Sequence, residues 1–353
     1  GEKRYLISGY DGQLSARGET LTLKNEMGVV IDTLSYPGSP TPGQDFLRIT
    51  EILFAPAAPT ESELAIDPTL TAEDFEFVEL TNTGSTPLDI SGASFVEGIS
   101  LSFPPQTILA AGQHILVVAN LTAFNLRYQG TDNVAGEYTG KLSNDGEQLQ
   151  ILDAEGENIL EFSYNDAWYD ATDDAGHSLV ARNPATTPIT DFDRPANWGV
   201  SLQQGGDPGI SSSFFAVTFS SWKYQNFSEE SVSDPTITGG SVDLDADTLN
   251  TVMEYGFGRN PTTSDSGNNY RASLVEYDGA DYLALSFRRQ KGALDLSYEV
   301  QFSNDLISWL PSEETVGEPR DNGDGTETVT IRDQIPASGN SNRYTRVRIA
   351  IGQ

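Results

Sequence analysis

The stretch YDGQLSARGETLTLKNEMGVVIDTLSY, residues 10–36, recurs without a gap 128 positions later as YTGKLSNDGEQLQILDAEGENILEFSY, residues 138–164. Eleven of the twenty-seven positions are identical, and their spacing is typical of two alternating strands and the turn between them. The identical residues of the first copy are Tyr10, Gly12, Leu14, Ser15, Gly18, Glu19, Leu21, Gly28, Ile31, Ser35 and Tyr36. An internal repeat of domain length indicates a chain built from copies of one β module. We therefore expect residues 1–45 to be the trailing half of a preceding repeat, in a chain that is the C-terminal piece of a longer array. Because a lone strand pair is marginally stable in water, we expect residues 10–36 to pack against residues 46–209.

The composition favours an all-β class. The chain has 353 residues, enough for two or three domains, and its eighteen Pro and thirty-three Gly indicate many turns. A net charge of −32 repels phosphate backbones and anionic lipids, so we expect neither a nucleic-acid partner nor membrane insertion. The acidity is typical of a surface solvated in a salty medium, and the sharper alternative is cation binding.

Cysteine is absent, which excludes disulfides, thiol catalysis and cysteine metal sites. The sequence contains no signal peptide and no run of eighteen apolar residues. These features are compatible with the cytoplasm and equally with the surface of an environmental bacterium. In a fragment, a missing signal carries no information about the compartment.

The pattern of strands and breakers predicts where one domain ends and the next begins. The run Pro37-Gly-Ser-Pro-Thr-Pro-Gly43 cannot continue a sheet, so a new domain is expected to open at Phe46. Apolar alternation predicts strands at 47–54, 75–80, 99–103, 114–119, 149–152 and 159–164. In 75–80 the acidic residues alternate with apolar ones, as in a half-buried strand. Short strands separated by frequent turns predict an immunoglobulin-like β-sandwich at residues 46–209.

Six motifs in this region resemble, in their order, those of the lamin-tail domain. They are Ile49-Thr-Glu-Ile-Leu53, Phe77-Val-Glu-Leu-Thr-Asn-Thr-Gly84, Leu88-Asp-Ile-Ser-Gly92, Leu109-Ala-Ala-Gly112, Leu142-Ser-Asn-Asp-Gly-Glu147 and Asn197-Trp198. The resemblance implies an immunoglobulin-like sandwich without an active site of its own. In bacterial proteins such domains are accessory modules of large secreted or surface proteins. The chain departs from the family in the acidic loop 55–74 and in the stretch 165–195, which is rich in Asp and Pro.

Beyond residue 209 we expect two further parts. Residues 210–268 are predicted to be a linker, beginning Ile210-Ser-Ser-Ser213, with a helix capped by Ser221 and a second helix over 248–257. Residues 269–353 are predicted to form a smaller β-sandwich. Its strands are expected at 274–277, 282–287, 296–302, 326–331 and 344–351. Two of its phrases, Val300–Leu306 with Trp309 and Asp324–Val329, resemble C-terminal modules of Verrucomicrobia-type secreted proteins.

One group of acidic residues has the spacing of a calcium-binding loop. Asp243, Asp245, Asp247 and Glu254 occupy positions 1, 3, 5 and 12 of a calcium loop, with the Leu249 carbonyl at position 7. Calcium takes six to eight oxygen ligands, and carboxylates two residues apart on a tight loop converge on one cation. The pattern wants Gly for a sharp turn at the position where this chain has Thr248. The sequence predicts a structural Ca²⁺ that rigidifies the joint between the two sandwiches, with chance alternation of Asp as the alternative.

Aromatic residues raise the question of a glycan site. Trp198 and Trp309 lie within the family-like motifs and are predicted to be core, and Trp222 is expected to pack the helical segment. Trp168 and Tyr169 lie in a predicted loop and are the candidate platform for a sugar, although a loop Trp also commonly plugs the end of a sandwich.

We expect a non-catalytic extracellular or cell-surface region, acting as spacer, adhesion or substrate-targeting modules of a larger bacterial protein. Its expected partners are the upstream domains of that protein, together with a polysaccharide or a cell-surface ligand. Two alternatives stay open. The region is a polysaccharide-binding module, or it is part of an enzyme whose active site lies upstream.

Overall fold

The computed structural model describes residues 14–173, 175–210, 215–264, 267, 269–338 and 342–352. The chain divides into two compact units. The first comprises residues 1–167, 172–198 and 204–212, and the second comprises residues 168–171, 199–203 and 213–353. Tyr10 and Gly12 of the repeat, and residues 211–213 of the predicted linker, lie outside the described residues.

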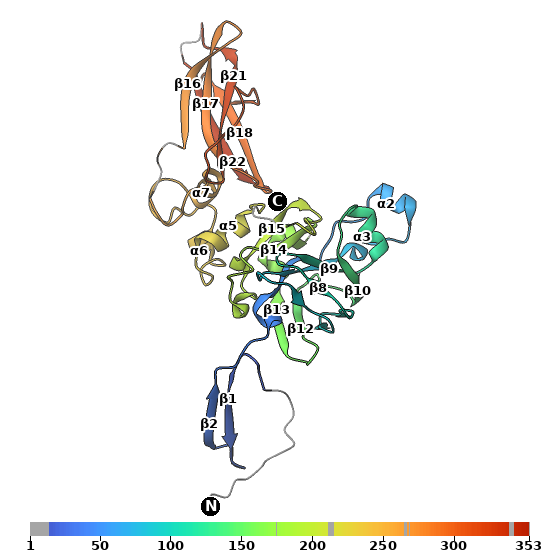
Figure 1. The fold of residues 1–353 in the computed structure, drawn as a ribbon. Coiled ribbons are helices and arrows are strands. Elements are labelled where there is room, and N and C mark those ends of the chain that lie inside the picture. The colour runs from blue at the N-terminus through green and yellow to red at the C-terminus, as the bar shows by residue number, and fades with distance from the viewer. Residues whose placement is uncertain are drawn as a thin grey trace, which may run out of the picture. The chain divides into compact units, whose positions relative to one another are not determined.

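The first unit is built on two sheets, as the predicted all-β, immunoglobulin-like class requires (Figure 1). The six-stranded sheet has the order β10-β9-β4-β3-β14-β15, and the five-stranded sheet has the order β11-β7-β6-β12-β13. The strands of the first sheet are β3 (Leu47–Leu53), β4 (Phe77–Asn82), β9 (His114–Val118), β10 (Val134–Glu137), β14 (His177–Ala181) and β15 (Trp198–Gln204). Those of the second are β6 (Ser94–Glu97), β7 (Ile99–Ser102), β11 (Thr139–Gly140), β12 (Glu147–Leu152) and β13 (Asn158–Tyr164). Residues 199–203 of β15 are counted in the second unit.

Short elements complete this unit. A small two-stranded sheet pairs β5 (Leu88–Asp89) with β8 (Ile108–Leu109). The α-helices are α1 (Pro42–Phe46), α2 (Glu61–Ile66), α3 (Leu121–Arg127) and α4 (Asp170–Asp173), of which α4 begins in the second unit. The 3-10 helices are η1 (Glu73–Phe75), η2 (Asp166–Trp168), η3 (Ile189–Asp191) and η4 (Pro195–Asn197).

The central strands β3 and β4 are buried along their whole length. Both lie inside the six-stranded sheet, and one of its faces packs Leu53, Phe77, Leu116 and Val118 against Phe124 of α3. The expectation of a half-buried strand at 75–80 was therefore wrong. The acidic residues of that segment are covered like their apolar neighbours, because a central strand covered on both faces has no solvated side.

The repeated sequence forms the same hairpin twice. In the first, β1 (Glu19–Lys24) pairs with β2 (Val30–Tyr36), and the irregularity in register falls between Leu23 and Lys24. In the second, β12 pairs with β13, and the irregularity falls at the equivalent step. The Tyr36 hydroxyl donates to the Ser15 carbonyl at 2.9 Å, and the Tyr164 hydroxyl donates to the Ser143 carbonyl at the same distance. The repeat is therefore present in the structure as well as in the sequence.

The two hairpins differ in their surroundings. We expected residues 10–36 to pack against residues 46–209, and for the described part of this segment that expectation was wrong. Apart from the partly buried ends Glu19 and Tyr36, both strands of the first hairpin are exposed (Figure 1). Among the described residues, hydrogen bonds hold the hairpin at its base, where Arg17 donates to the Gln44 and Ile159 carbonyls and the Ala16 amide donates to Glu157. The physical reason is that the place of such a hairpin in the sandwich is already taken by β12 and β13.

The second unit contains a smaller two-sheet sandwich, as expected for residues 269–353. Its sheets have the orders β16-β17-β21-β20 and β19-β18-β22. Their strands are β16 (Tyr270–Tyr277), β17 (Ala280–Gln290), β18 (Leu296–Ser303), β19 (Leu310–Ser312), β20 (Arg320–Asp321), β21 (Thr326–Pro336) and β22 (Tyr344–Ile351). The core is formed by Leu285, Phe287, Val300, Phe302, Val329 and Ile331. All five strands predicted for this region are present.

Three short helices precede this sandwich: α5 (Phe219–Asn226), α6 (Pro235–Thr238) and α7 (Thr251–Phe257). The sequence predicted Ser221 as the N-cap of the first helix, but the helix begins one turn earlier. Thr218 is the N-cap of α5 and Ser221 is the third helical residue, and the two close a reciprocal capping box. Trp222 is buried as expected, at 5.5 Å from the Tyr255 ring. No described helix is long and apolar enough to cross a membrane.

Candidate metal centre

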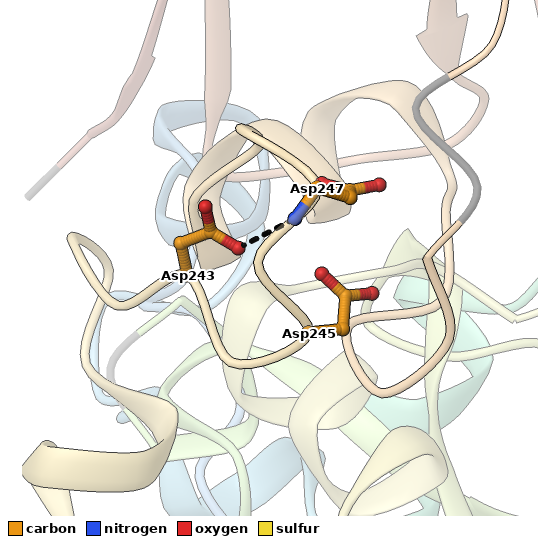
Figure 2. Close-up of side chains that lie close together, drawn as sticks. All are labelled: Asp243, Asp245 and Asp247. Atoms are coloured by element: carbon orange, nitrogen blue, oxygen red, sulfur yellow. Dashed lines mark hydrogen bonds between the residues drawn. The ribbon is translucent and has the colours of Figure 1, made fainter.

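Three of the five residues predicted to hold calcium lie together in the loop between α6 and α7. One carboxylate oxygen from each of Asp243, Asp245 and Asp247 lies within 4.8 Å of the others (Figure 2). This arrangement brings together the hard oxygen donors that calcium prefers. The two-residue spacing of the sequence thus becomes spatial convergence, because the loop doubles back between these positions.

Hydrogen bonds from the backbone to Asp243 close the loop. Its carboxylate accepts the Asp247 amide at 3.2 Å and the Thr248 amide at 3.0 Å (Figure 2 draws the first of these). Thr248 has a φ of 83°, in the left-handed region where the calcium-loop pattern has Gly. A β-branched residue rarely adopts this conformation. Thr248 therefore adopts the left-handed conformation that Gly adopts in the pattern, and the backbone is strained at this residue.

The three carboxylates repel one another. Burial raises the pKa of the Asp245 carboxyl, and the negative charges of Asp247 and Asp243 raise it further. A cation among the three charges would remove this repulsion, so the donor set fits a divalent metal.

The other two predicted ligands are the Leu249 carbonyl and the Glu254 carboxylate. Leu249 is buried, and its amide donates to the Asp247 carboxylate at 2.9 Å. Glu254 is buried in α7, with its side chain 1% exposed, and it is not one of the three residues whose ligand atoms converge. The structure thus brings together positions 1, 3 and 5 of the predicted loop and leaves position 12 apart from them.

The predicted sugar platform is not presented to solvent. Trp168 is 8% exposed and Tyr169 is fully buried, with its ring 5.8 Å from that of Tyr224 in an edge-on arrangement. A sugar stacks on the open face of a ring, and neither ring offers one here. The expectation that these two residues contact a glycan is therefore contradicted by their burial, and their role in the described structure is packing.

A buried acidic network in the first unit was missed by sequence reasoning. Glu51 of β3 and Glu79 of β4 stand directly opposite each other in the sheet, and both are at most 2% exposed. The Ser178 hydroxyl donates to Glu51 at 2.5 Å, and His114 Nδ1 lies 2.8 Å from Glu79 Oε1. Burial raises the pKa of Glu51 to about 8, and the charge of Glu79 adds to this effect. In an acid-rich sequence nothing marks two glutamates as buried, so only the pairing of the strands could find them.

This network holds the segment that follows β15. The Asp207 amide donates to Glu51 at 2.9 Å, and the Gly209 amide donates to Glu79 at 2.6 Å. Each carboxylate thus accepts one backbone amide from this segment. The arrangement gives His114 and Ser178 structural partners: Glu79 for the first and Glu51 for the second.

Comparison with known families supports the resemblance over part of the chain. Residues 40–166 match the family model of the Lamin Tail Domain. No curated protein was found to match the chain. The matched range contains the strands from β3 to β13 and ends before β14 and β15, which complete the six-stranded sheet. The family match thus supports an immunoglobulin-like module and assigns no catalytic residue.

Proposed function

We propose that this chain, with its lamin-tail match at residues 40–166, is a non-catalytic extracellular region of a larger bacterial surface or secreted protein. It acts there as spacer, adhesion or substrate-targeting modules next to the upstream domains of that protein. The module order we propose is 1–45, 46–209, 210–268 and 269–353. Nucleic acid and membrane insertion are not part of its role.

The repeated hairpin is the observation that carries this proposal. Two hairpins with the same register and the same tyrosine hydrogen bonds, followed by a second β unit, are typical of tandem β modules. Such arrays place functional domains at a distance from a surface. The net charge of −32 supports the proposal, because it keeps an exposed array soluble.

Two experiments test this function separately. Protease treatment of intact cells that make the tagged parent protein should remove the region if it is extracellular, whereas a cytoplasmic control protein should survive. The purified chain should not turn over any member of a panel of ester, phosphodiester and glycoside substrates. Turnover that co-purifies with the chain would contradict the non-catalytic role, and full protection in intact cells would contradict the location.

The polysaccharide-binding alternative rests on Trp168 and Tyr169 or on a calcium-bridged loop. Burial of the two aromatic residues leaves the calcium loop as its basis. The enzyme alternative places its active site upstream of this chain, and it is tested by the activity of the parent protein.

We propose in addition that Asp243, Asp245 and Asp247 bind one structural Ca²⁺. We expect calcium at about one hundred times its dissociation constant to stabilise the second unit by roughly 2.7 kcal/mol, because a ligand that binds only the folded state shifts the unfolding equilibrium. Calorimetry of the chain in chelator and in millimolar calcium measures this shift. The transition of the first unit should not move.

The matched variants are Asp245→Asn and Asp278→Asn. Asp245→Asn should abolish the calcium shift and raise the melting temperature in chelator, because it removes one of three converging charges. Asp278 lies in an exposed turn of the same unit, and its substitution should leave the calcium shift unchanged. An equal melting temperature in chelator and calcium for the unsubstituted chain would contradict the site.

A further inference from the structure

The first hairpin carries an apolar face with no cover in the described part of the chain. Leu21, Leu23 and Leu34 lie on one side of the ribbon and are 37%, 50% and 63% exposed. The opposite side carries polar residues, namely Thr20, Thr22, Thr33 and Ser35. A ribbon with one apolar and one polar face is the pattern of a sheet that packs on a core.

The second hairpin shows what covers such a face. Its equivalents of Leu21 and Leu23 are Leu149 and Ile151, both fully buried. The outer edge of β12 pairs antiparallel with β6, placing Ile151 opposite Phe95. The Tyr164 ring lies 5.0 Å from Phe54, which follows β3. Residues of 46–137 thus provide both the neighbouring strand and part of the opposing layer.

We propose that the β1–β2 hairpin is a docking surface for the first part of another lamin-tail-type sandwich, a segment equivalent to residues 46–137. A strand equivalent to β6 adds to the free edge of β1, and a layer equivalent to β3 and β4 covers Leu21 and Leu23. Among the described residues, β1 pairs only with β2, so the edge is available. An exposed edge with apolar neighbours favours the addition of a strand.

A second copy of this chain is a poorer occupant than such a segment. In each copy, the edge of β6 that would pair with β1 is already paired with β12. One residue further specifies the partner. Asp32 stands on the apolar face at the position of Leu160, which is fully buried in the second hairpin. The Asp32 carboxylate already accepts the Thr33 amide at 2.9 Å. The natural partner therefore offers a further hydrogen-bond donor opposite Asp32, because burying a charged carboxylate with incomplete hydrogen bonding is costly.

The test uses an extended chain in which a second copy of residues 46–137 directly precedes residue 10, so that Glu137 is followed by Tyr10 as it is by Tyr138. Hydrogen exchange measured by mass spectrometry reports on residues 19–36. We expect exchange about 100-fold slower in the extended chain than in the original one, because the amides of β1 gain a partner strand. Residues 147–164 serve as the internal control for folding of the intact sandwich.

Two substitutions with the same new side chain separate the faces. In the extended chain, Leu23→Gln should abolish the added protection, whereas Thr22→Gln on the opposite face should preserve it. The added copy comes from a sandwich that has Leu160 at the position of Asp32. The extended chain is therefore also measured with Asp32→Leu. Equal exchange of residues 19–36 in the original and extended chains, with and without Asp32→Leu, would overturn the proposal. A dimer of the original chain that Leu23→Gln dissociates, detected by light scattering, would also overturn it in favour of a second copy.

Discussion

Trp198→Ala is expected to destabilise the first unit by about 3–5 kcal/mol, the usual cost of truncating a buried Trp. The Trp198 side chain is fully buried and stacks on Phe162 with ring centroids 5.4 Å apart. Its indole nitrogen donates to the Phe192 carbonyl at 2.7 Å, so the substitution also leaves a covered carbonyl without its donor. Urea unfolding followed by far-ultraviolet circular dichroism measures the loss.

Trp309→Ala is the matched control. Trp309 was expected to be core, yet it is only half-buried, with the Arg346 guanidinium 4.1 Å from its ring centre. Its removal should cost the second unit no more than about 1 kcal/mol, the size of an exposed cation–π contact. A loss below about 1 kcal/mol for Trp198→Ala, or equal losses for both substitutions, would show that the first unit does not depend on this aromatic cluster.

The first unit is expected to lose stability as the pH rises from about 4.5 through 8, and Glu51→Gln should remove most of that loss. The folded state raises the pKa of Glu51 from 4.5 to about 8, because the carboxyl is buried and faces Glu79. Its contribution is therefore fully present below pH 4.5 and is lost as the pH rises through 8. A shift of this size corresponds to at most about 5 kcal/mol, which makes the pH profile of unfolding the measurement.

Glutamine at this position keeps an acceptor for the Asp207 amide and the Ser178 hydroxyl but cannot ionise. A smaller slope should remain, because burial also raises the pKa of Glu76, to about 7, and the sign is the same. The control is Glu97→Gln at an exposed position of β6, which should leave the pH profile unchanged. If Glu51→Gln and Glu97→Gln gave the same profile as the unsubstituted chain, the buried acid pair would not govern stability.

Local pattern predicted the elements of this protein well and their surroundings less well. Strand positions at 282–287 and 296–302 agree with β17 and β18, because alternation and turn residues act within a few neighbours. The same alternation misassigned 75–80 as half-buried. Whether a strand is covered on one face or two depends on its place in the sheet, which is set by segments far away in sequence.

For the candidate metal site, too, the sequence predicted one part of the arrangement and not the rest. The spacing of Asp243, Asp245 and Asp247 sufficed to predict that their carboxylates converge, because all three lie on one short loop. It did not suffice for Glu254, which is buried in α7 and is not one of the converging residues. For Trp168 and Tyr169, a predicted loop position suggested that the side chains face solvent, but both are buried.

The sequence by itself determined that one hairpin occurs twice, because register, turn and the tyrosine hydrogen bonds all arise within twenty-seven consecutive residues. Only the tertiary structure decided that one copy is core and the other is surface. Burial of an apolar face requires an opposing layer, and that layer comes from residues distant in the chain. Residues 46–137 pack around β12 and β13, and within the described part of the chain they provide no second layer to cover β1 and β2.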